Sequence, residues 1–154
     1  MKMKIRLSSI GEKIGGINLN SLEGRINFQK SIYLLKELGA IKEKFKFSWY
    51  IFGPYSPDVA RIGFDLVERK IDTEISVSND FESKIDQFKE LIKTNSDESK
   101  WLELLATLHF MRKYEYPNLT KEEIFEKLVE HQPYYDNKEL FERGWEFITS
   151  FFSF

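Results

Sequence analysis

The sequence has 154 residues, of which 42% are hydrophobic and 16% aromatic, with 23 Lys and Arg against 25 Asp and Glu. A chain of this length and composition can bury a core of its own, so we expect one globular domain over residues 1–154 and not a disordered chain. It contains no cysteine, which excludes disulfides, thiolate metal sites and cysteine nucleophiles.

The charges are spread unevenly along the chain. Residues 1–70 carry 13 Lys and Arg against 7 Asp and Glu, and residues 71–154 carry 10 against 18, so the two parts have net charges of +6 and −8. This asymmetry is modest, and it favours solvated helix surfaces over a nucleic-acid-binding surface. No apolar signal-peptide segment follows the basic first residues, and the longest uncharged stretch, residues 47–57, is shorter than a membrane span of ~20 residues. We therefore expect a cytoplasmic protein that does not associate with membranes.

The first segments of the chain show both strand and helix patterns. Residues 1–8 alternate apolar and basic side chains as a strand does, but the isoleucines that follow have helical spacing, so both structures remain open there. A helix is predicted from Asn20 to Gly39, with one apolar face that consists of Phe28, Ile32, Leu35 and Leu38. Asn20 and Glu23 form a capping-box pattern at its start, and Gly39 suits the residue after a helix C-terminus.

A strand followed by a tight turn is predicted next. Apolar side chains alternate with Lys46, Ser48 and Tyr50 over residues 45–51, which indicates a strand with one buried face. The structural turn that follows consists of Gly53, Pro54, Ser56 and Pro57. Glycine permits a strained backbone conformation, and a serine followed by proline suits the N-cap and first position of a helix.

That helix is predicted to run to about residue 70, and residues 71–77 alternate again as a second strand, long enough to pair with the first. A break and a new helix cap are predicted at residues 95–97. The remaining helices are predicted at residues 81–92, 101–111 and 120–132 and from residue 137 onward. Thr120 and Glu123 form a second capping-box pattern at the start of the third of these four helices. The predicted fold is therefore α+β and predominantly α-helical, with about six helices and a small two-stranded β element near residues 45–77. A winged-helix-like arrangement of this element is left open.

Catalysis finds little support in the sequence. His109 lies in an apolar helix and His131 at a helix end before Pro133, and neither has a metal-binding partner at helical spacing. Phosphate-binding, dinucleotide-binding and serine-hydrolase motifs do not occur. We therefore predict that the chain is not an enzyme, and we predict no catalytic residue, metal site or cofactor.

The most specific feature is a pair of segments, RINFQKSIYLLK at residues 25–36 and FSWYIFGPYSPDVA at residues 47–60. They resemble the YwgA-like and SocA-like proteins, the Panacea antitoxin group, in which a helix reading LQKLxYLL precedes an aromatic strand and YGPYSPxLA. Phe52 stands where that group usually has Tyr or His, and residues 101–110 and 129–135 also look like YwgA-type sequence. The resemblance implies a compact helical domain with a small sheet, found either as an antitoxin-like partner of diverse toxins or as a stand-alone protein. It implies no metal, cofactor or catalytic set.

We accordingly predict a non-enzymatic protein-binding regulator that masks a partner protein, such as a toxin. Aromatic side chains beside a rigid turn are suitable anchors for an interface, and Tyr50 is expected to point outward because Trp49 shares the apolar face of its strand. Tyr55 is expected to be exposed on the turn. The candidate partner contacts are Lys46, Trp49, Tyr50, Tyr55 and Arg61.

The alternative is a winged-helix-type DNA-binding transcriptional regulator. In that case the nucleic-acid contacts would come from the helix after the turn, through Arg61, Arg69 and Lys70. This alternative is less favoured because the same helix also carries acidic residues, namely Asp58, Asp65 and Glu68.

Overall fold

The computed structural model describes residues 3–93 and 97–154, and the α+β, mostly helical fold class is confirmed, with seven α-helices in the described part of the chain. Residues 95 and 96 of the predicted break lie outside the described residues. The elements are β1 (Met3–Arg6), α1 (Leu7–Lys13), α2 (Leu22–Glu37), β2 (Ser48–Tyr50), β3 (Gly53–Tyr55), α3 (Pro57–Glu68), β4 (Glu74–Val77), α4 (Phe81–Ile92), α5 (Glu98–Phe110), the π-helix η1 (Met111–Glu115), α6 (Lys121–His131), the 3-10 helix η2 (Pro133–Tyr135) and α7 (Lys138–Phe151).

The start of α2 differs by one residue from the sequence prediction. The N-cap is Ser21, whose hydroxyl accepts the backbone N–H of Gly24 at 3.0 Å. Asn20 lies one residue before the cap, and its own N–H donates to the side chain of Asn18 in the preceding turn. Either residue type can cap a helix, so the choice depends on the path of the loop and not on residue preference.

The predicted turn into α3 and the predicted capping box of α6 are both confirmed. Gly53 has a φ of 97°, a left-handed conformation that favours glycine. Ser56 caps α3 by accepting the N–H of Val59, and proline occupies the first turn of this helix. At α6, Thr120 and Glu123 each bond the backbone of the other, which satisfies two N–H groups at the helix start.

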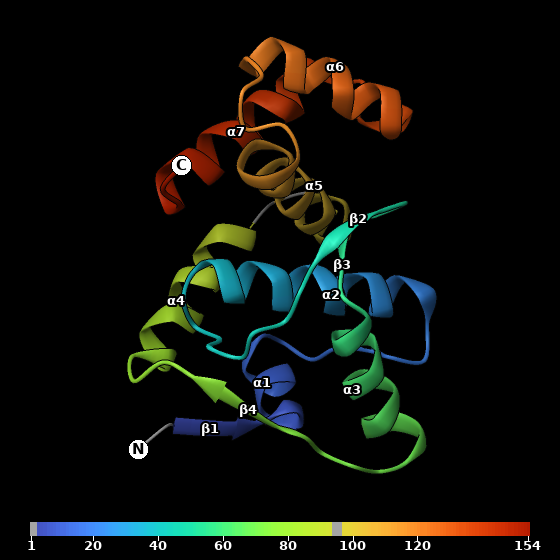
Figure 1. Cartoon of the computed structure of the whole chain (residues 1–154), viewed down its shortest axis with the longest axis vertical. Coiled ribbons are helices and arrows are strands. Elements are labelled where there is room, and N and C mark those ends of the chain that lie inside the picture. Colours follow the sequence, from blue (N-terminus) through green and yellow to red (C-terminus); the bar gives the residue numbers. More distant parts are fainter. Residues whose placement is uncertain (1–2, 94–96) are drawn as a thin grey trace.

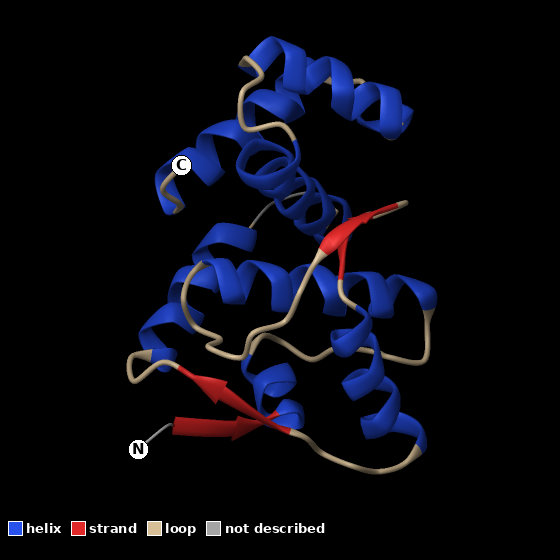
Figure 2. Ribbon diagram, viewed as in Figure 1, coloured by secondary structure: helices blue, strands red, loops and turns tan. Residues whose placement is uncertain are grey.

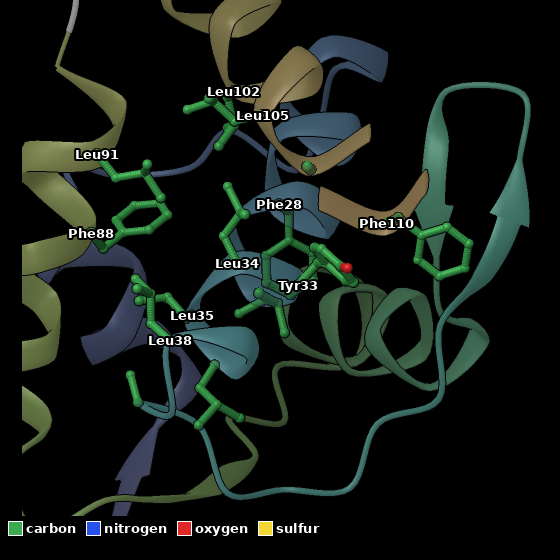
Figure 3. Packing of buried hydrophobic residues seen from close by; sticks show 14 of the residues in the cluster. Phe28, Tyr33, Leu34, Leu35, Leu38, Phe88, Leu91, Leu102, Leu105 and Phe110 are labelled. Carbon is green, nitrogen blue, oxygen red and sulfur yellow. The ribbon is translucent and has the colours of Figure 1, made fainter. Parts of the chain in front are cut away.

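Helix α2 runs through the middle of the molecule, between the β1–β4 pair and the end formed by α5, α6 and α7 (Figure 1). Its buried face packs on α5 and α4, and Figure 3 shows side chains from these three helices interlocking around Leu34 and Phe88. Helix α5 is buried on nearly every face, as its apolar sequence predicts. Burial of this shared core is the main force that holds the helices together.

The strand pairing differs from the prediction that residues 71–77 pair with residues 45–51. Among the described residues, β4 pairs with β1 in an antiparallel register that matches Ile75 with Ile5, and β2 pairs instead with β3 (Figure 2). The winged-helix-like arrangement of residues 45–77 therefore does not form. Only residues 48–50 of the predicted first strand are extended and paired, and the turn at Gly53 folds them back on β3 as a short hairpin.

Candidate functional site

A groove of about 510 Å³ lies between α2, α3 and the β2–β3 hairpin. Its floor lies where the two helices approach closely, since a Cβ added at Gly63 of α3 would lie 2.9 Å from the ring of Phe28 on α2. Its lining residues are Leu19, Leu22, Arg25, Ile26, Phe28, Gln29, Lys30, Tyr50, Ile51, Phe52, Tyr55, Ala60, Gly63, Phe64, Val67 and Glu68. The volume is within the range of ligand-binding pockets.

Large apolar side chains line this groove and remain exposed to solvent. Leu22, Tyr50, Ile51 and Phe64 are between 53% and 66% exposed, and they account for four of the nine large hydrophobic side chains that are exposed in the described residues. The hydrophobic effect makes such a concentration unfavourable unless another molecule covers it. The groove is therefore the candidate functional site.

The hairpin wall of the groove is held by buried polar side chains from α2. Gln29 bonds Ser56 reciprocally, donating to its carbonyl and accepting its N–H, both at 2.9 Å. The next residue, Lys30, donates from Nζ to the carbonyl of Pro54 at 2.8 Å. The segments at residues 25–36 and 47–60, which resemble the Panacea pattern, thus form one structural unit. Gln29 and Lys30 of the first segment bond backbone groups of Ser56 and Pro54 in the second.

A third polar side chain holds the hairpin from the other side. Gln132, which follows α6, donates to the carbonyl of Ile51 at 3.3 Å and to Glu103 at 3.2 Å. Burial raises the pKa of Glu103, although the hydroxyl of Tyr134 and the nearby ammonium of Lys30 oppose this effect. Burial lowers the pKa of Lys30 to about 8, with Glu103 opposing that shift. These buried charges show how tightly the base of the hairpin is enclosed.

Two of the predicted partner contacts line the groove together. Tyr50 is exposed, as its strand position predicts, and its ring lies 5.1 Å from that of Tyr55, centroid to centroid. Tyr55, which is expected to be exposed on the turn, is instead half-buried. The pair forms an aromatic surface at the end of the groove where α3 begins.

The other predicted contacts lie outside the groove lining. Trp49 faces the opposite side of the hairpin, where its ring stacks on Phe110 and lies edge-on to His131. Lys46 is exposed before β2, and Arg61 is exposed on α3. The structure therefore brings Tyr50 and Tyr55 together and places Lys46, Trp49 and Arg61 elsewhere.

The basic residues predicted for nucleic-acid contact are engaged by neighbouring groups of α3. Arg61 lies 3.9 Å from Asp58 and 3.6 Å from Asp65, and Arg69 lies 3.8 Å from Asp65. Lys70 donates to the carbonyl of Val67 at 2.9 Å. Carboxylates beside these arginines reduce the positive potential that a phosphate backbone requires.

The two histidines lie away from the groove. His109 is fully buried, its Nδ1 lies 2.6 Å from the hydroxyl of Tyr33, and burial lowers its pKa to about 4. His131 is bonded through Nε2 to Tyr116 at 3.1 Å. Within residues 3–93 and 97–154, no group of three or more His, Cys, Asp or Glu side chains could hold a metal ion.

Several groove residues were missed by sequence reasoning, namely Leu22, Ile26, Ile51, Phe64 and Val67. A signal for them exists in α3, where Val59 and Ile62 point to the core while Ala60, Phe64 and Val67 recur at helical spacing on another face. A helix with two apolar faces in a chain of this size indicates one face that packs and one that binds. Gln29 and Lys30 were missed as anchors because polar helix residues usually face solvent.

Comparisons with known protein families, with curated proteins and with solved structures gave no match for this chain. The resemblance to the Panacea group therefore stays a prediction from the two motif segments. None of the helices in the described part of the chain is long and apolar enough to cross a membrane.

Proposed function

We propose that this chain is a non-enzymatic protein-binding regulator, antitoxin-like in action, which masks a functional surface of a partner protein such as a toxin. The observation that carries the proposal is the concentration of exposed apolar side chains in one groove. Exposed apolar patches rimmed by polar residues are typical of protein interaction sites. Lys30 and Glu68 line the groove, but Lys30 is buried and its ammonium donates to the carbonyl of Pro54, while most of the lining is apolar. We therefore favour apolar recognition over acid–base chemistry.

The rigidity of the hairpin supports a binding role for its aromatic residues. Gln29, Lys30 and Gln132 fix the backbone on both sides of the turn that presents Tyr50 and Ile51. Side chains on a fixed backbone lose less conformational freedom when a partner binds, so more of their buried area contributes to affinity. Tyrosine is also among the residues that most often dominate the energy of an interface.

The charges on α3 support a protein in preference to a nucleic acid as the partner. Asp65 lies between Arg61 and Arg69 and pairs with both. A DNA-binding helix would have to break these pairs before its arginines could contact phosphates or bases. We therefore retain protein masking as the proposed function.

The proposal is tested by reconstitution with a purified partner. A tagged wild-type chain is used to recover candidates from the source organism, and each is then purified and titrated by calorimetry. We expect a 1:1 complex that inhibits the partner's activity, and at least a tenfold weaker affinity, about 1.4 kcal/mol, for the double variant Tyr50→Ser, Ile51→Ser. Its melting temperature should stay within a few degrees of wild type, because both side chains are exposed.

The matched control is Ile71→Ser, which changes a similarly exposed apolar residue outside the groove and should keep full affinity. The proposal fails if the hairpin double variant binds as tightly as wild type. It also fails if a saturating amount of the chain leaves every recovered partner fully active.

A further inference from the structure

The two long walls of the groove have the residue spacing of a helix-binding surface. The groove-facing positions are Leu22, Ile26 and Gln29 on α2, and Ala60, Phe64 and Val67 on α3. On each helix these positions follow the spacing i, i+4, i+7, which places them in one row. Each row spans seven residues and is therefore about 10 Å long at 1.5 Å per residue, or two helical turns.

Helices α2 and α3 lie close together where α3 begins, at Gln29 and Ser56, and separate toward the end of α3, so a third helix would lie in the wedge between them (Figure 1). Helix-in-groove recognition buries apolar residues at i, i+3 or i+4, and i+7 of the bound helix, which matches two such rows in length. A β-strand is a poorer occupant, because the lining helices offer it no free backbone N–H and C=O groups with which to form a ladder. The hairpin supplies Tyr50 and Tyr55 as an aromatic stop at one end.

The charges at the groove indicate which helix fits. Arg25 on the α2 wall and Glu68 on the α3 wall are exposed, and neither forms an ion pair with any residue in the described ranges. Arg25 makes one long hydrogen bond, 3.4 Å to the carbonyl of Leu19. The arginines on α3 outside the groove are instead paired with carboxylates. Each wall of the groove thus offers a partner one exposed charged side chain, positive on α2 and negative on α3.

We infer that the groove binds an amphipathic α-helix of a partner protein, with its apolar stripe in the groove, an acidic flank toward Arg25 and a basic flank toward Glu68. This inference rests on the proposed function and names the segment that the partner must supply. Opposite charges on the two walls also fix which flank faces which wall, so the bound helix has one preferred orientation.

The test is a selection of helical peptides on the immobilised full chain. A display library of three-turn helices, with an apolar stripe and randomised flanking positions, should yield binders with acidic residues on one flank and basic residues on the other. The selected peptides should bind Phe64→Ser at least tenfold more weakly than wild type by fluorescence anisotropy, and should bind Ile71→Ser as tightly as wild type. Thermal melts should show that both variants are folded.

The charge assignment is tested by exchanging the two walls. Selection on the double variant Arg25→Glu, Glu68→Arg should yield helices with the reversed flanks, and each single variant should weaken wild-type binders several-fold at low salt. Both residues are exposed, so these variants should fold. Binders without flank preference, or with the same preference on both proteins, would overturn the assignment.

Two other outcomes would overturn the inference. One is the absence of any enriched helix, and the other is binding of a small amphiphile such as laurate in place of peptides, which would make the groove a small-molecule pocket. Failure of the proposed function is distinguishable from these results. If helices bind as described but the purified partner binds the hairpin double variant as tightly as wild type, the groove is a helix-binding site and the masking role is wrong.

Discussion

At the scale of single residues, Gly53 links the sequence to the candidate site most directly. Its φ of 97° is strained for any residue with a side chain, and a Cβ at this position would lie 2.5 Å from Oγ1 of Thr107 on α5. The need for glycine at the turn was predictable from the Gly-Pro-Tyr-Ser-Pro sequence. The contact with Thr107 was not, because it depends on how α5 packs behind the hairpin.

Gly53→Val should therefore lower the free energy of unfolding by about 2–4 kcal/mol, since it combines backbone strain with a steric overlap. Thr107→Ala removes the overlapping hydroxyl and should recover part of this loss in the double variant, which denaturant unfolding would measure. Gly11→Ala is the control, because a Cβ at Gly11 has no neighbour within 4 Å. An unchanged unfolding midpoint in Gly53→Val would contradict the strained turn.

At the scale of elements, the β2–β3 hairpin is too short to be stable alone, and its strands have three residues each. Its stability comes from the side chains that bond its backbone, of which Gln29 makes two bonds to Ser56. Helix caps and turns in this chain were predictable because they depend on residues close in sequence. The partners of β4 were not, because alternating apolar residues show that a segment is a strand but not which strand it meets.

Gln29→Met keeps a similar side-chain volume but leaves the buried N–H of Ser56 without a partner. The C=O of Ser56 loses one of its two donors and keeps the N–H of Ala60. We therefore expect a destabilisation of about 1–3 kcal/mol. Gln87→Met is the matched control on an exposed face of α4 and should change stability by no more than about 0.5 kcal/mol. Urea unfolding at neutral pH measures the change in the free energy of unfolding for both variants. Equal stabilities of the two variants would show that the hairpin does not depend on this clamp.

At the scale of the whole molecule, α2 serves two purposes. One face is buried against α4 and α5, and another forms a wall of the groove opposite α3. The sequence predicted the first face from its regular apolar spacing. The groove could not be predicted, since it exists only because Gly63 lets α3 approach α2 closely while the hairpin closes one end.

The central claim, that the groove is covered by a protein partner, is tested most directly by hydroxyl-radical footprinting of the purified complex. Tyr50 and Phe64 in the groove are 53% and 55% exposed, and Tyr114 and Phe154 outside it are 47% and 50% exposed. In the free chain, Tyr50 should oxidise at a rate similar to that of Tyr114, and Phe64 at a rate similar to that of Phe154. In the complex we expect oxidation of Tyr50 and Phe64 to fall several-fold while Tyr114 and Phe154 keep their rates. Protection of Tyr114 and Phe154 with continued oxidation of Tyr50 and Phe64 would contradict the account.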